Sequence, residues 1–130
     1  MSTFNAIGVA GTGVTVYRKW LDAVSDNIAN INNVSRTSEN AFQARYVIAQ
    51  EAADGNGAQV GGVAFGSGQG VITHEPDNPL ADAEGNVRKP DIDLGSQMAQ
   101  MMMAQRAYQA NLAVVDRARD SYTAAINLGK

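Results

Sequence analysis

The residues that could perform chemistry in this chain gather between positions 74 and 82. The single histidine, His74, is followed by Glu75, Asp77 and Asp82. Imidazole and carboxylate groups bind divalent metals, but protein sites combine several such ligands at regular spacing, and the chain has no cysteine or second histidine to complete a set. We therefore interpret His74 as a surface histidine at the end of a strand and expect no metal ion and no cofactor.

Two further patterns could indicate a nucleotide site or an active site, and neither is complete. Gly11-Thr12-Gly13 begins like a dinucleotide-binding glycine motif, but the third glycine is absent and no strand is expected before it. We expect these small residues to let helices approach closely instead. Acid–base catalysis needs two positioned carboxylates in a cleft, and nothing marks such a pair among the acidic residues. The sequence predicts no catalytic residue, no small-molecule substrate and no enzyme.

Composition excludes other classes of function. The net charge is −3 with no basic stripe, which argues against nucleic-acid binding. No apolar run approaches the roughly 20 residues that a membrane-spanning helix needs. The N-terminus lacks a basic region followed by a continuous apolar stretch, so we expect no cleaved signal peptide.

Both ends of the chain carry an apolar seven-residue repeat. The N-terminal stripe consists of Ile7, Val14, Tyr17, Leu21, Val24, Ile28 and Ile31, and the C-terminal stripe of Leu94, Met98, Met101, Tyr108, Leu112, Val115, Tyr122 and Ile126. Steps of three and four place each set on one helix face, and a face this narrow is typical of helices that pack on other helices. We predict that the two stripes are assembly seams.

The expected helices cover residues 3–31 and 91–127. Ser2 or Thr3 is a suitable N-cap for the first, and asparagines after Ala29 are expected to end it in the left-handed conformation. Asp91 or Asp93 is a suitable N-cap for the second, which Gly129 would end.

Between the helices the pattern changes to strands and turns. Apolar and β-branched residues predict short strands at 44–50, 59–65 and 71–74, and the three prolines predict turns over 75–90. The expected fold is mainly α with a small β-rich insert: two long terminal helices form a coiled-coil-like pair, with a short antiparallel β and turn domain between them. We divide the chain into an N-terminal core helix (1–33), an outer middle domain (34–90) and a C-terminal core helix (91–130).

Three segments resemble the flagellar axial proteins, the superfamily of rod and hook subunits. The first motif is Asp26, Asn27, Ala29 and Asn30, directly after the first stripe, and the second is Arg106, Tyr108, Ala110 and Asn111. A third segment, 75–90, is similar to the turn-rich element of proximal-rod subunits of the FlgC type, through Pro76, Pro79, Ala81, Asp82, Gly85, Val87 and Pro90. The short chain also suits that family.

The resemblance implies a structural subunit that polymerises through its terminal helices into the tubular rod of the flagellar basal body, which spans the periplasm. It implies copies of itself, other rod proteins and the flagellar export apparatus as partners, and export without a cleaved signal peptide. Two alternatives remain at this point: another short rod subunit, and a helical adaptor protein outside the flagellum. An enzyme is a distant third.

Overall fold

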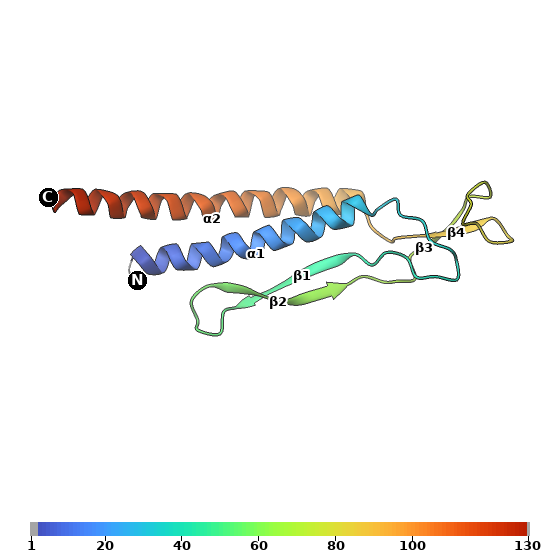
Figure 1. The fold of residues 1–130 in the computed structure, drawn as a ribbon, viewed down its shortest axis with the longest axis horizontal. Helices are drawn as coiled ribbons and strands as arrows, with labels where there is room; N and C mark the ends of the chain where they lie inside the picture. The colour runs from blue at the N-terminus through green and yellow to red at the C-terminus, as the bar shows by residue number, and fades with distance from the viewer. Residues whose placement is uncertain (1–2, 130) are drawn as a thin grey trace. The chain divides into compact units, whose positions relative to one another are not determined.

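A computed structural model describes residues 3–129. The elements are α1 (Thr3–Ala29), β1 (Arg45–Glu51), β2 (Ala58–Phe65), β3 (Val71–His74), β4 (Asn86–Lys89) and α2 (Leu94–Leu128) (Figure 1). Two long helices thus enclose a small antiparallel β region in the chain order, which confirms the predicted fold class. Contacts divide the chain into two compact units: the first holds the chain up to Leu21, Val47–Gly62 and the chain from Met102 on, and the second holds Asp22–Tyr46 and Val63–Met101.

Helix α1 starts and stops close to its predicted limits. The proposed N-cap Ser2 lies outside the described residues, and Thr3 is already the first residue of the helix. The end differs in mechanism from the expectation. The amide of Asn30 makes the regular helical bond to the Asp26 carbonyl at 3.1 Å, and the amide of Ile31 then donates to the Ile28 carbonyl at 3.3 Å, so the helix ends in a tighter turn. Within residues 3–129 only glycines have a positive φ, so the expected left-handed asparagine is wrong.

Helix α2 begins three residues later than expected because Asp93 is its cap. The amide of Ser96 donates to Asp93 Oδ2 at 2.6 Å, and the amide of Gln97 donates to the Asp93 carbonyl at 3.0 Å. A carboxylate that accepts from the first turn satisfies an otherwise unpaired donor. At the other end α2 stops at Leu128, directly before the predicted Gly129, whose amide donates to the Ile126 carbonyl at 3.2 Å without the left-handed conformation of a glycine cap.

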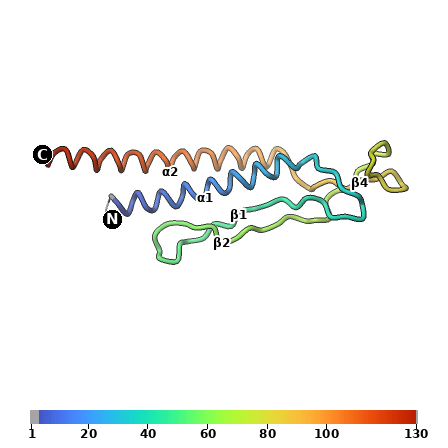
Figure 2. Tube along the Cα trace, in the orientation of Figure 1, coloured from blue at the N-terminus to red at the C-terminus, as the bar shows by residue number. Residues whose placement is uncertain are grey.

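In each unit a stretch of α1 lies beside a stretch of α2 (Figures 1 and 2). In the first unit the rings of Phe4 and Tyr122 meet edge to face at 4.8 Å between centroids. In the second unit the side-chain amides of Asn27 and Gln97 are hydrogen-bonded at 3.0 Å. The pairing of the terminal helices therefore has specific contacts in both units.

The four strands form two separate two-stranded sheets. Main-chain hydrogen bonds from Gly66 to Ala44 (2.7 Å) and from Ala52 to Gly57 (3.0 Å) close the β1–β2 hairpin at its two ends. β3 and β4 are antiparallel, with Thr73 opposite Val87. The prediction found β1, β2 and β3 to within a residue or two but missed β4, which it placed in a turn region.

Candidate assembly surfaces

The side of α2 with the lowest exposure is built from small and polar residues as well as apolar ones. It steps by four and three along the helix through Gln97, Met101, Ala104, Tyr108, Asn111, Val115 and Ala118. One contact in each unit shows that α1 faces this row: Gln97 is hydrogen-bonded to Asn27 in the second unit, and the amide group of Asn111 lies against Gly13 in the first. The two helices therefore pack through a face of α2 that contains alanine, glutamine and asparagine, and the predicted apolar stripe includes only part of this face.

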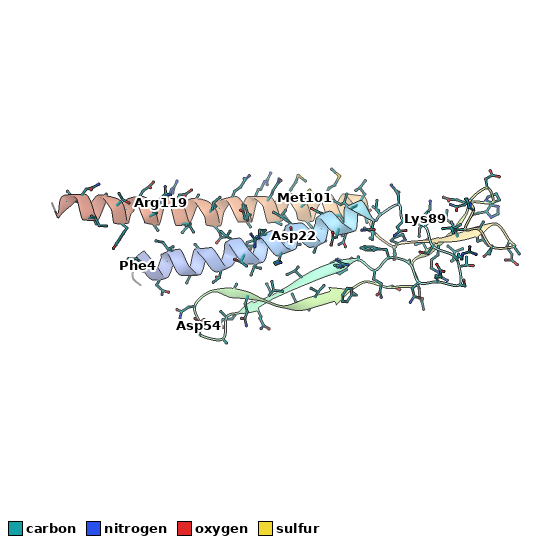
Figure 3. The ribbon with its side chains drawn as sticks, in the orientation of Figure 1. Phe4, Asp22, Asp54, Lys89, Met101 and Arg119 are labelled. Carbon is teal, nitrogen blue, oxygen red and sulfur yellow. The ribbon has the colours of Figure 1, made fainter. Side chains whose placement is uncertain are left out.

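The predicted C-terminal stripe lies partly on this covered side and partly beside it. Leu94, Met98, Leu112, Tyr122 and Ile126 are each 40–53% exposed, whereas Met101, Tyr108 and Val115 are half-buried. Met102, Met103 and Val114 are also exposed on the same helix. Figure 3 shows side chains standing out from α2 along its length. An apolar surface of this extent is typical of an interface, not of the free surface of a monomer.

The N-terminal stripe is better covered than the C-terminal one. Val24 is fully buried and the other six members are half-buried: Ile7, Val14, Tyr17, Leu21, Ile28 and Ile31. Trp20 stacks on Tyr17 with ring centroids 5.9 Å apart, which fills the flank of the stripe. Helix α1 thus buries much of its apolar face inside this chain, while α2 keeps much of its own exposed.

The first family motif is explained by a hydrogen-bonded junction in the second unit. The Asn27 side chain is fully buried. Its Nδ2 donates to the Arg45 carbonyl at 2.9 Å and to Gln97 Oε1 at 3.0 Å, and its Oδ1 accepts from the Arg45 amide at 2.8 Å. Asn30 Nδ2 donates to the Asp26 carbonyl at 2.8 Å, which satisfies part of the helix end. Ala29 is exposed.

Arg45 and Gln97 are the partners of Asn27 in this junction, and the sequence alone did not predict either of them. Besides its main-chain bonds to Asn27, Arg45 forms an exposed ion pair with Asp26 at 2.8 Å. Gln97 is 2% exposed although glutamine is usually a surface residue. One feature of the sequence did indicate a special role for Asn27: asparagine is a poor helix former, and Asn27 lies in the last turns of a predicted helix.

The second motif is divided between the helix contact and the surface. Asn111 is half-buried and donates from Nδ2 to the Ala107 carbonyl at 2.8 Å. A Cβ on Gly13 would lie 2.6 Å from Asn111 Oδ1, so the absence of a side chain there allows the approach. This confirms the expected role of the small residue at Gly13, but not at Gly11, where nothing lies within 4 Å. Arg106 and Ala110 are exposed.

The turn motif is organised around the carboxylate of Asp82. It accepts from the Asn86 amide at 2.8 Å, the Thr37 hydroxyl at 2.9 Å and the Glu84 amide at 3.1 Å. These donors favour the ionised form, and the Asn86 amide contributes most to lowering the pKa of Asp82 below its ordinary value. Gly85 has a φ of +78° and is buried against His74 and Pro76, where a Cβ would clash.

The remaining motif positions form the base of the same turn region. Val87 is fully buried and Pro90 is buried, whereas Pro76 and Pro79 are exposed and Ala81 is half-buried. Arg88 holds the loop before β1 in place, since its amide donates to the Ser35 carbonyl at 2.9 Å and its Nη2 donates to the Thr37 carbonyl at 2.7 Å. The residues of this motif therefore hold the turn in its conformation.

The other candidate sites in the described part of the chain are the single histidine and one apolar groove. His74 is the exposed last residue of β3, as interpreted from the sequence, and its Nδ1 lies 3.2 Å from Asn86 Oδ1. Within residues 3–129 no three potential metal ligands gather at one point. A mainly apolar groove of about 320 Å³ in the first unit has Lys19 as its one charged lining residue among those described. None of the helices in the described part is long and apolar enough to cross a bilayer.

Comparison with known proteins identifies the class and then the family. Residues 83–128 match the family described as "Flagellar basal body rod FlgEFG protein C-terminal", which defines the class as flagellar rod proteins. The chain is 31% identical to flagellar basal-body rod protein FlgC of Salmonella typhimurium over all of both chains. It is 34% identical to FlgC of Agrobacterium fabrum over 94% of this chain and 91% of that one, and 24% identical to FlgC of Bacillus subtilis over all of both. The chain belongs to the FlgC family of flagellar basal-body rod proteins.

Proposed function

We propose that this chain is a structural subunit of the flagellar basal-body rod, and that it assembles by packing the exposed apolar side of α2 against neighbouring subunits. The observation that carries the proposal is the series of apolar side chains on α2 that this chain leaves 40–53% exposed. Burying one such side chain stabilises an assembly by about 1.5–3 kcal/mol, so a few contacts per subunit suffice. Family membership supports the rod and argues against the adaptor alternative.

Within the rod we place this subunit in the proximal part, next to copies of itself and other rod proteins. Export through the flagellar apparatus without a cleaved signal peptide, and a final position in the rod across the periplasm, follow from the same proposal. The predicted seams are then contact surfaces between subunits, and residues 34–90 form the outer domain. We assign no catalytic activity, because a rod subunit acts by transmitting force through its contacts.

A pair of charge substitutions on α2 tests this proposal. Leu112 is 40% exposed, so Leu112→Asp should leave the fold intact while it places a carboxylate in the proposed interface. Burying an unpaired charge there is strongly unfavourable. In cells that lack their own FlgC-family subunit, we expect the variant to be made but absent from purified basal bodies, and the cells to be non-motile.

The matched control is Ser121→Asp, which adds the same charge at an exposed position on the opposite side of α2, nine residues after Leu112. It should restore motility to a level near that of the unaltered chain if the apolar side of the helix is the contact surface. Swimming cells with Leu112→Asp subunits in their basal bodies would remove the assigned interface and leave family membership untouched.

A further inference from the structure

The junction around Asn27 contains two side-chain amides that are removed from water. Asn27 is 0% exposed and Gln97 is 2% exposed, and they are the two polar residues buried in the described part of the chain. Burial of an amide is unfavourable unless each polar atom finds a partner. Alanine or leucine would fill a helix contact without this requirement. The pair therefore needs an explanation other than apolar packing.

The hydrogen bonds of Asn27 join three segments that are distant in sequence. Its Nδ2 donates to Gln97 Oε1 on α2 at 3.0 Å, and the same amide group exchanges two bonds with the Arg45 main chain at the start of β1. One side chain near the end of α1 thus holds both a strand and the opposite helix. The polar atoms of the Asn27 side chain have all of these hydrogen-bond partners only when the three segments are in place together.

A shift of α2 by one helical turn would break this junction. Along the row of α2 that faces α1, in steps of three and four, it would bring Leu94 or Met101 opposite Asn27 in place of Gln97, and neither side chain has an oxygen that can accept the hydrogen bond. Asp93 and Gln100, the other residues one turn away, lie off this row. An amide hydrogen would then be buried without a partner, which destabilises the shifted arrangement relative to the observed one. Apolar contacts alone would not discriminate as strongly, because they are non-directional and methionine packs adaptably.

A second contact between the helices lies two heptads away. Gly13 lies 14 residues before Asn27 on α1, and Asn111 lies 14 residues after Gln97 on α2. There Asn111 fills the space that the missing side chain of Gly13 leaves. Each contact lies within one unit, and both correspond to the same antiparallel alignment of the two sequences.

We propose that Asn27 and Gln97 are positioning residues that select a single register of α1 against α2. A buried polar pair in a helix interface is the usual means by which coiled coils specify register at the expense of stability. The inference concerns the folded chain and does not depend on the function proposed above, so failure of either one leaves the other standing.

The test uses two substitutions of Gln97 in the full-length chain, with opposite expected effects. Gln97→Met keeps the volume but removes the acceptor; we expect an unchanged or higher urea midpoint and more than one set of NMR signals for the Arg45 amide. Gln97→Glu keeps an acceptor oxygen but buries a carboxyl group; we expect a lower midpoint and a single set of signals. Gln105→Met, at an exposed position of the same helix, is the control and should change neither readout.

The contact between the Phe4 and Tyr122 rings reports the register at positions distant from the junction in sequence. Their centroids are 4.8 Å apart, which gives a strong nuclear Overhauser effect, and a slip of one turn would move one ring by about 5.4 Å along the helix axis relative to the other. We expect this effect to fall at least twofold in Gln97→Met and to persist in Gln97→Glu. A single signal set with the full effect in Gln97→Met would overturn the proposal, and so would an unfolded Gln97→Met chain, because the pair would then supply stability and not register.

Discussion

At the scale of residues, two glycines of α1 have different surroundings although they are two positions apart. A Cβ on Gly11 would meet nothing within 4 Å, whereas a Cβ on Gly13 would lie 2.6 Å from Asn111 Oδ1. Alanine is the better helix former by about 1 kcal/mol. We therefore expect Gly11→Ala to stabilise the chain by up to about this amount and Gly13→Ala to destabilise it, because the Asn111 side chain must move.

Urea denaturation followed by circular dichroism at 222 nm measures both variants of this glycine pair. Gly8→Ala is a second control, since Gly8 also has an open surrounding. Equal stabilisation by all three alanines would show that α1 does not approach α2 closely at Gly13.

Acid is expected to destabilise the turn between β3 and β4. Hydrogen bonds lower the pKa of Asp82 below its ordinary 3.8, mainly through the Asn86 amide, and the pKa of Glu75 below its ordinary 4.5, mainly through Lys89. A carboxylate whose pKa is lower in the folded state stabilises the fold above its ordinary pKa, and this contribution disappears as pH falls through the lowered value. We expect the turn to be intact above pH 4.5 and to weaken progressively below pH 3.8.

Amide NMR signals of Asn86 and Val87, recorded from pH 6 downward, follow this change in the turn. Asp82→Asn keeps an oxygen that can accept from the Asn86 amide but does not titrate, so its profile should be flatter than that of the unaltered chain. Identical profiles for the two chains would assign the acid sensitivity to other groups.

The junction at Asn27 illustrates what the sequence could not reveal at this scale. The motif around Asn27 was found, but its partners lie 18 and 70 residues away, at Arg45 and Gln97. A glutamine in an amphipathic helix is ordinarily assigned to the solvent side. Only the alignment of the two helices shows that Gln97 is buried, and that alignment is a property of the folded chain.

At the scale of elements, the helices were predictable because their repeats are long and regular. Strand β4 was not, since its four residues Asn86–Lys89 include a single apolar side chain, Val87. It is a strand because Asp82 and Gly85 form the turn that brings it against β3. The covered face of α2 was partly missed for a related reason: alanines, Asn111 and Gln97 occupy positions where only large apolar residues were expected.

The turn between β1 and β2 allows a test of where the chain accepts an insertion. Gly57 has a φ of +109° and lies against Thr12, whose Oγ1 accepts from the Ala58 amide at 3.1 Å. Gly55 lies in the exposed part of the same turn. We expect a four-residue Gly/Ser insertion after Gly55 to be tolerated, and the same insertion after Gly57 to disturb the contact with α1 and lower the thermal midpoint, since loop length itself has little effect on stability.

Circular dichroism melting and the amide exchange rate of Ala58 distinguish the two insertions. The Ala58 amide should exchange slowly in the unaltered chain and after the first insertion, and rapidly after the second. Equal protection in both variants would mean that the hairpin end does not depend on Thr12.

At the scale of the whole molecule, residues 3–129 bury small apolar side chains and leave most of the larger ones at least partly exposed. Apart from Pro90, the buried apolar side chains among the described residues are all alanine or valine: Ala10, Val16, Ala23, Val24, Ala41, Ala44, Val87 and Ala104. Larger apolar side chains remain exposed on α2 and on the strands. Because apolar burial is the main stabilising contribution in folding, such a distribution suits a subunit that completes its core in an assembly.

Removal of residues 123–130 tests this division between folding and assembly. Every described residue after Tyr122 is exposed, and the Phe4–Tyr122 contact would remain, so the shortened chain should keep its fold and lose little stability. It would lack Ile126 and Leu128, which are 48% and 89% exposed in this chain. If those side chains contact neighbouring subunits, their loss should block rod assembly while circular dichroism and the ring contact stay unchanged.

The chain with the insertion after Gly55 is the control, because we place that hairpin in the outer domain and expect it to assemble normally. A motile strain with the shortened subunit, together with a non-motile one with the insertion, would reverse our assignment of the inner and outer parts.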